Sequence, residues 1–171
     1  MRAAGFTFDV VVADVDESVR PGESPSTYVR RLAADKSAAV RAPDAVVLGA
    51  DTTVVVNGEI LGKPRDDDEG VAMLKRLSGQ THEVLTGVSL RQGAYEVGRV
   101  ETTSVVFRAL TDQDIAWYVA SGEGRDKAGG YAIQGLASRF IPSIAGSYAN
   151  VVGLPVACVA ELVSSLLASR L

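Results

Sequence analysis

The sequence predicts one α/β domain over residues 1–171, with a mixed β-sheet and flanking helices. Helix-type and strand-type segments alternate along the chain, which is typical of this class. Residues 45–50 are almost wholly apolar, as expected for a strand buried on both faces. Two long β-type segments, 83–91 and 95–107, flank a short glycine turn and should pair as antiparallel strands. A chain of 171 residues can bury such a core without disulfides.

The first segments predict a strand, an acidic turn and a helix. Residues 6–12 alternate enough to form a strand, and the acidic turn DVDE follows at 14–17. Ser24 and Pro25 supply an N-cap and a first-turn proline for a helix, which Pro43 should end. The apolar strand at 45–50 comes next.

A hairpin is predicted directly after this strand. The apolar run ends at Ala50, so Asp51 and the two threonines after it should emerge where the strand stops being covered. A second β-type run at 54–56 meets Asn57-Gly58, the strongest two-residue hairpin signal. The returning strand leads to Lys63, and we expect the hairpin to bring this ammonium back towards Asp51.

The chain after the hairpin predicts three further helices and a binding loop. An acidic helix start at 66–68 precedes an apolar helical face that closes at Ser78-Gly79. Thr111 and Asp114 form a capping-box pattern for the next helix, and 153–155 begin the last one. The glycine-rich stretch 122–153 lacks long periodicity, which is typical of a binding loop.

Composition excludes several classes of protein. No apolar run approaches the roughly 20 residues that cross a bilayer, so we expect no membrane partner. A net charge of −4 with dispersed basic residues argues against a nucleic-acid partner. The single cysteine, Cys158, lies among apolar residues and is predicted to be a core residue. The first ten residues lack a signal-peptide pattern, which predicts a cytoplasmic location.

Acidic residues at two expected strand ends suggest a metal and phosphate site. Glu17 follows the first strand and Asp51 the next. Phosphoanhydride hydrolysis needs a divalent ion and a base for water, and carboxylates can serve both needs. An oxygen site suits Mg²⁺ or Mn²⁺, whereas one histidine and one cysteine cannot assemble a zinc site. The alternative is that these are ordinary turn acids.

Three lysines and one glutamine are further candidates for substrate binding. Lys36, Lys63 and Lys127 flank the expected acidic site and could stabilise a leaving pyrophosphate. Lys36 and Lys127 could each instead be a solvent-exposed lysine, whereas Lys63 lies between Gly62 and Pro64 on a restricted backbone. Gln134 carries a donor and an acceptor that suit the imide edge of uracil or thymine, or it could satisfy a nearby turn. His82 is interpreted as a surface or hydrogen-bonded residue and not as a general base.

Four segments together resemble the Maf family of nucleoside triphosphate pyrophosphatases. They are GADTTVVVNGEILGKP, LSGQTHEVLTGV, DKAGGYAIQG and IAGSYANVVGLP, and they occur in this order. The resemblance implies an inosine-triphosphatase-like fold, in which an elongated mixed sheet and its helices form a cleft. It also implies metal-dependent hydrolysis of a nucleoside triphosphate to the monophosphate and pyrophosphate.

The resemblance also implies residue roles. Asp51 matches the proton acceptor, Thr52 and Gln134 match positions that set substrate preference, and Glu17, Lys36 and Lys63 match residues that line the metal and phosphate site. The I-Q-G form at 133–135 resembles the branch that acts on dTTP and UTP.

One departure from the family pattern concerns the start of the chain. Members normally begin with a strand and an S-x-S-P-R-R loop before an A-G-F segment, whereas here A-G-F already stands at 4–6. Either the chain starts at a later methionine than the true one, or it is shortened, with a missing first strand and weakened catalysis. No arginine is assigned to the phosphate clamp by motif.

The sequence therefore predicts a metal-dependent pyrophosphatase for dTTP, UTP and related nucleotides. A nucleotide-binding or cell-division regulator with little turnover is the alternative, and a purine-directed pyrophosphatase is a third. A homodimer is the assembly to test first, since twofold dimers are the commonest homo-oligomers.

Overall fold

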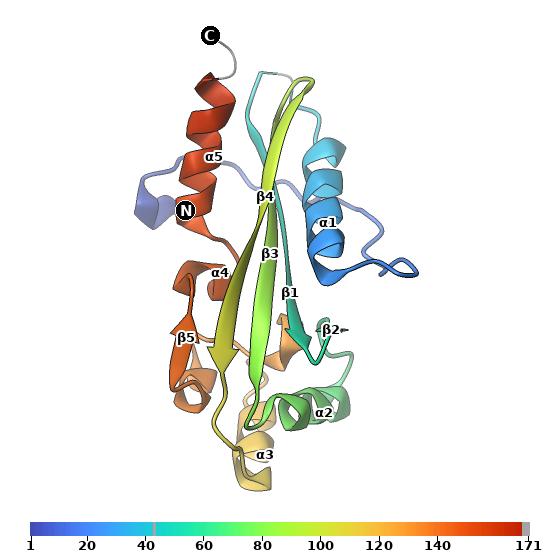
Figure 1. Ribbon diagram of the computed structural model, residues 1–171, viewed down its shortest axis with the longest axis vertical. Coiled ribbons are helices and arrows are strands. Elements are labelled where there is room, and N and C mark those ends of the chain that lie inside the picture. Colours follow the sequence, from blue (N-terminus) through green and yellow to red (C-terminus); the bar gives the residue numbers. More distant parts are fainter. Residues whose placement is uncertain (43, 169–171) are drawn as a thin grey trace. The chain divides into compact units, whose positions relative to one another are not determined.

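The computed structural model describes residues 1–42 and 44–168. They form helices and a β-sheet joined by loops (Figure 1). Its five α-helices are α1 (Pro25–Ala39), α2 (Asp67–Leu77), α3 (Asp112–Ala120), α4 (Tyr148–Val152) and α5 (Val156–Ala168). The strands are β1 (Val47–Val56), β2 (Glu59–Leu61), β3 (Thr81–Gln92), β4 (Tyr95–Val106) and β5 (Ser143–Ala145). Three short 3₁₀ segments complete the described elements: η1 (Arg2–Ala4), η2 (Ala128–Gly130) and η3 (Leu136–Phe140).

The strands form one sheet in the order β2-β1-β3-β4-β5. Pairing is antiparallel between β1 and β2 and between β4 and β5. The sheet is antiparallel throughout (Figure 1), whereas a mixed sheet was expected. The α/β class with flanking helices is confirmed.

Several local predictions are confirmed because they depend on interactions between near neighbours. The Ser24 side chain caps α1, the Asp66 side chain caps α2, and Thr111 and Asp114 form the expected capping box of α3. Asn57 and Gly58 both have positive φ, as the tight turn between β1 and β2 requires.

Other expectations about the first third of the chain were wrong. Residues 6–12 form no strand, and Val10 and Val12 are 79% and 93% exposed, because an alternating pattern cannot supply hydrogen-bond partners from another strand. Helix α1 ends at Ala39, and Pro43 lies outside the described residues. The runs on either side of Asp51 form one strand, so Asp51 lies within β1 and not at a strand end.

The described residues separate into two compact units, each treated by itself below. The first unit takes its residues from Met1–Asp51, Thr86–Glu101 and Leu154–Leu171. The second takes its residues from Thr52–Leu85 and Thr102–Gly153.

In the first unit, helices α1 and α5 cover opposite faces of the strands. Successive strand residues point to opposite faces, so Val88 and Leu90 of β3 pack against Val159 and Leu162 of α5. Cys158 is buried in this cluster, as predicted. The alternate residues of β3 face α1.

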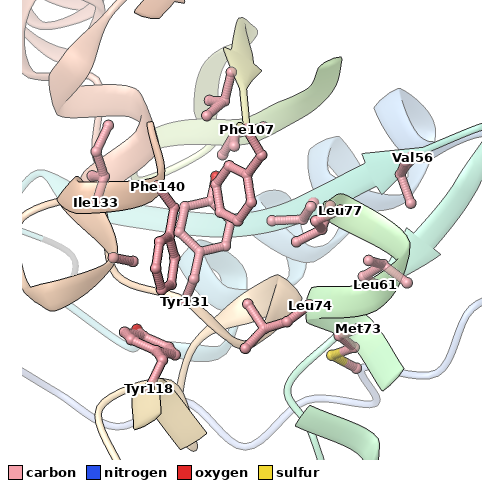
Figure 2. Packing of buried hydrophobic residues seen from close by; sticks show 14 of the residues in the cluster. Val56, Leu61, Met73, Leu74, Leu77, Phe107, Tyr118, Tyr131, Ile133 and Phe140 are labelled. Carbon is pink, nitrogen blue, oxygen red and sulfur yellow. The ribbon is translucent and has the colours of Figure 1, made fainter. Parts of the chain in front are cut away.

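In the second unit, side chains from α2 and α3 pack with aromatic and aliphatic residues of the strands and of 131–140 in one core (Figure 2). Phe107 and Tyr131 pack edge to face, with ring centroids 4.9 Å apart. His82 also lies in this core, and its Nε2 atom and the Tyr131 hydroxyl are 2.8 Å apart. The hydrogen-bonded interpretation of His82 is therefore confirmed, and the surface one is not.

No helix within residues 1–42 and 44–168 has the length and apolar composition to cross a membrane.

Candidate functional site

Helix α1 lies directly on the backbone of two strands of the first unit. A Cβ atom placed at Gly49 of β1 would lie 2.2 Å from the Ala33 carbonyl oxygen, and one at Gly87 of β3 would lie 2.1 Å from that of Val29. Only glycine permits this approach. The two strands therefore fix the depth at which the helix packs.

A chain of polar contacts fixes α1 laterally. The hydroxyls of Ser37 and Ser89 lie 2.8 Å apart, and Ser89 donates to Glu96 at 2.6 Å. The Arg30 guanidinium donates to both carboxylate oxygens of Glu96. The helix thereby has one defined register against β3 and β4.

Asp51 faces this helix because of strand alternation. Gly49 packs under α1, so the side chain two residues later points to the same face. There the Asp51 carboxylate accepts a hydrogen bond from the Lys36 ammonium at 2.6 Å. The sequence predicted this residue as a candidate, but the reason for its position is alternation within a strand and not the end of a strand.

Lys36 also pairs with Glu17, so one ammonium bridges two carboxylates. The distance from its Nζ atom to Glu17 Oε1 is 2.7 Å. Burial lowers the pKa of Lys36, but the hydrogen bonds that its ammonium donates to Asp51 and Glu17 outweigh that effect and raise the pKa. The structure thus brings together Glu17, Lys36 and Asp51, three residues that the sequence singled out.

Tyr28 lies beside this cluster and was not predicted. Its hydroxyl donates to the main-chain carbonyl of Glu17 at 3.0 Å. Burial raises the pKa of the Tyr28 phenol, and the negative charges of Asp51 and Glu17 raise it further. A tyrosine on the apolar side of a helix gives no sequence signal for such a contact.

The donor set of this cluster fits a hard divalent ion. The Glu17 and Asp51 carboxylates supply oxygen atoms, and Mg²⁺ commonly uses one or two carboxylates together with waters and substrate phosphates. No group of three or more histidine, cysteine, aspartate or glutamate side chains occurs in the described part of the chain that could hold a metal without a substrate. These two carboxylates therefore suit a metal that takes its remaining oxygen ligands from water or from a bound substrate.

The second unit brings together the other two candidate lysines. Gly129 donates its amide to the Gly62 carbonyl at 2.9 Å, which joins the segment after β2 to the 126–130 turn. Lys127 donates to Asp126 at 2.7 Å. This hydrogen bond lowers the pKa of Asp126, and the charge of Lys63 lowers it further. Asp126 is the ion-pair partner of Lys127 and lies within the electrostatic influence of Lys63, a role that the sequence did not indicate.

Thr52 and Gln134 occupy different settings in the second unit. The Thr52 hydroxyl donates to the Gly153 carbonyl at 3.1 Å. Gln134 is exposed on a turn between buried Ile133 and η3. The turn is anchored on both sides, because Ala132 donates its amide to the Tyr118 hydroxyl and Leu136 donates its amide to Glu123. The Gln134 side chain is thus presented by a fixed backbone.

Several known proteins are similar in sequence to nearly the whole of this chain. The chain is similar to the dTTP/UTP pyrophosphatase of Escherichia coli O157:H7, with 50% identity over 169 residues that cover 97% of this chain and 86% of the relative. It is 52% identical over 162 residues to the dTTP/UTP pyrophosphatase of Anaeromyxobacter dehalogenans, which covers 92% of this chain and 82% of the relative. It is also 49% identical over 169 residues to the nucleoside triphosphate pyrophosphatase of Shigella flexneri, covering 97% and 86%.

The model of the Maf-like protein family matches residues 1–166, nearly the whole chain. This match and the identities near one half agree with the resemblance of the four segments. The chain belongs to the Maf family.

Proposed function

We propose that this protein hydrolyses dTTP, UTP and related nucleotides to the nucleoside monophosphate and pyrophosphate. The observation that carries the proposal is the cluster in which Lys36 joins Glu17 and Asp51. It provides a base, a phosphate-binding cation and oxygen ligands in one place. Two relatives that share about half of the sequence are named dTTP/UTP pyrophosphatases, which supports this substrate class. The inosine-triphosphatase-like form of the α/β fold is part of the proposal.

Asp51 acts as the general base. Its carboxylate takes a proton from a water molecule, and the oxygen of that water forms a bond to the α-phosphorus. The bond between the α-phosphorus and the oxygen that bridges to the β-phosphorus breaks, and that oxygen leaves with the pyrophosphate. The hydrogen bond from Lys36 orients the Asp51 carboxylate.

Glu17 and Asp51 would hold a divalent ion, Mg²⁺ or Mn²⁺. When bound, such an ion offsets the negative charge of the phosphates. Lys36, Lys63 and Lys127 bind phosphate oxygens, and ammonium groups act most strongly where water is excluded. Proton transfer and the orientation of the phosphates are carried out by the side chains named above.

Gln134 and Thr52 set the choice of base and substrate. The amide of Gln134 offers one acceptor and one donor, the pattern that complements the N3–H and a neighbouring carbonyl of uracil or thymine. The anchored turn supports this role, since a fixed backbone limits the positions of an exposed side chain. The proposed cytoplasmic location and homodimer remain predictions.

Pyrophosphate release with Mg²⁺ over a panel of dTTP, UTP, other nucleotides and inosine triphosphate tests the proposal. We expect the highest kcat/KM for dTTP and UTP, and at least a hundredfold loss in Asp51→Asn, on the order seen when a catalytic group is removed. Asp44→Asn is a matched control, because Asp44 lies on an exposed loop. Equal activity of Asp51→Asn and the wild type would reject the mechanism.

Two other outcomes would identify the alternatives. Calorimetric binding of UTP without release of pyrophosphate would favour a regulatory nucleotide-binding protein. Preference for inosine triphosphate over UTP in competition would favour a purine-directed pyrophosphatase.

A further inference from the structure

The loop that carries Glu17 takes its main-chain partners from α1. Residues 14–20 belong to no helix or strand, so their carbonyl groups need partners other than a regular ladder. Three successive carbonyls find them on the helix. Arg31 donates to the carbonyls of Asp16 at 3.4 Å and Ser18 at 3.0 Å, and Tyr28 donates to that of Glu17 at 3.0 Å.

Arg31 is itself held in place by the end of the same loop. Its Nε and Nη2 atoms donate to the two carboxylate oxygens of Glu23, at 2.7 and 2.8 Å. The Arg31 and Glu23 side chains are only 12% and 5% exposed. This hydrogen-bonded pair holds the pKa of Glu23 at about 2. Because a guanidinium is planar and carries five donors, it can contact Glu23 and two carbonyls at once, which an ammonium cannot.

Helix α1 therefore contacts Glu17 at two points. Its carbonyl accepts from Tyr28, and its carboxylate pairs with Lys36 at 2.7 Å. The loop has its own turn as well, since Asp16 accepts hydrogen bonds from the amide and the hydroxyl of Ser18. The Arg31 guanidinium also lies 5.6 Å from the centre of the Tyr28 ring, so a cation–π contact joins the two side chains that hold the loop.

We propose that Tyr28 and Arg31 are positioning residues that fix the Glu17 carboxylate for metal binding. They act through the main chain of residues 16–18 and touch neither metal nor nucleotide. The inference rests on the proposed function, in which Glu17 is a metal ligand. It assigns a role to Arg31 that is distinct from a phosphate clamp, because its guanidinium is engaged by Glu23 and by the loop.

The proposal predicts a defect in metal binding that excess metal repairs. Loss of a group that orients a metal ligand typically reduces metal affinity by 10- to 100-fold. Tyr28→Phe removes only the hydroxyl, so we expect the Mn²⁺ dissociation constant to rise about tenfold. Arg31→Gln and Arg31→Lys should both raise it by on the order of 10- to 100-fold, since lysine retains the charge but not the fork.

The test uses the full chain and combines three measurements. Hydrogen exchange of the amides in residues 16–20 reports the loop without nucleotide or metal. Calorimetric titration with Mn²⁺ in the presence of a non-hydrolysable UTP analogue reports metal affinity. The dependence of pyrophosphate release on Mg²⁺ concentration reports catalysis, and kcat of Tyr28→Phe should return to near the wild-type value at saturating Mg²⁺, whereas that of Glu17→Gln should not.

Matched controls separate the loss of the Tyr28 and Arg31 contacts with the loop from general effects of substitution. Tyr95→Phe removes a hydroxyl from a tyrosine that is 58% exposed. Arg65→Gln removes an arginine whose side chain is 83% exposed. Neither should change exchange in residues 16–20 or affinity for Mn²⁺.

We expect faster exchange in residues 16–20 of the Tyr28 and Arg31 variants, with exchange of α1 and β3 unchanged, together with weaker Mn²⁺ binding. Unchanged exchange in this loop would overturn the proposal. Faster exchange with unchanged Mn²⁺ affinity would also overturn it, because the contacts with the loop would then have no bearing on Glu17 as a ligand. Neither measurement needs turnover, so both decide the inference even where the wild type releases no pyrophosphate and the proposed function fails.

Discussion

At the scale of single residues, the candidate site depends on how charges are paired. Lys36 lies between two carboxylates, and its side chain is 21% exposed, so screening by water is reduced. The exposed ion pairs elsewhere in the chain, such as Arg125 with Asp67, contribute little to stability. Lys36 is therefore the lysine whose removal should change activity most.

Replacement of Lys36 by methionine should lower kcat/KM for UTP by on the order of 10²- to 10³-fold. The variant loses both the phosphate-binding cation and the hydrogen bond that orients Asp51. Steady-state pyrophosphate release at saturating Mg²⁺ measures the loss, with circular dichroism to confirm folding. Lys75→Met is the control, because Lys75 is exposed on α2. Full activity of Lys36→Met would contradict the assigned role.

His82 shows how burial turns one residue into a source of pH-dependent stability. It is 2% exposed, and its Nδ1 atom has no hydrogen-bond partner among the described residues. Burial lowers its pKa from 6.5 to about 4. The unfolded chain therefore binds a proton between these pH values that the folded chain does not bind. The stability that the folded protein gains from keeping His82 neutral is fully present above pH 6.5 and is lost as the pH falls towards 4.

We expect His82 to lower the free energy of unfolding by about 3 kcal/mol between pH 6.5 and pH 4. Urea unfolding across this range measures the slope. His82→Phe keeps a ring between Phe107 and Tyr131 but cannot titrate. Its free energy of unfolding should therefore fall by about 3 kcal/mol less than that of the wild type over this pH range. The comparison uses slopes, since the Tyr131 hydroxyl also loses its partner in the variant. Parallel slopes for the two proteins would refute the assignment.

At the scale of elements, α1 is the helix on which the acidic cluster depends. It supplies Lys36 and contacts the loop around Glu17, and it is set against the strands by Gly49 and Gly87. Neither glycine has a positive φ, so their value is space and not backbone freedom. A side chain at either position would push the helix away from the sheet.

Gly87→Ala should destabilise the protein by about 1–3 kcal/mol, because the new Cβ would clash with the Val29 carbonyl. The melting temperature should fall by roughly 5 °C. Calorimetry measures both quantities. Gly62→Ala is the matched control, since nothing lies within 4 Å of a Cβ placed at Gly62 and it should change stability by less than about 1 kcal/mol. A neutral Gly87→Ala would show that α1 can move without cost.

At the scale of the whole molecule, three strands contribute core residues to both compact units. β1 supplies Leu48 to one core and Val54 to the other. β3 and β4 do the same with other residues, and the chain changes unit within each strand. Because neither core can lose these strands alone, we expect the units to unfold together, in agreement with the single domain that the sequence predicts.

Urea unfolding should therefore show one transition with the same midpoint for both units. Trp117, the only tryptophan, lies on α3 and reports the second unit by fluorescence. Hydrogen exchange of α5 reports the first. Coincident midpoints support a single cooperative domain. Two separate midpoints would show that the single-domain prediction is wrong.

The sequence by itself determined the elements whose signals lie within a few residues of one another. Ser24, Asp66 and Thr111 cap their helices as predicted, because each bonds to an amide three residues ahead. The Asn57-Gly58 turn and the hairpin of β3 and β4 follow from local backbone preferences in the same way. Family membership also came from the sequence, since it depends on long segments in a fixed order.

The tertiary structure alone decided which candidates meet and what holds them. Residues 6–12 have a strand pattern but form no strand, because pairing requires a neighbour that the pattern does not supply. Asp51 is oriented by alternation within β1, and Tyr28 and Arg31 contact the Glu17 loop 11 to 15 residues away. Such contacts arise only when α1 packs on Gly49 and Gly87, because packing brings together groups that local sequence preferences leave apart.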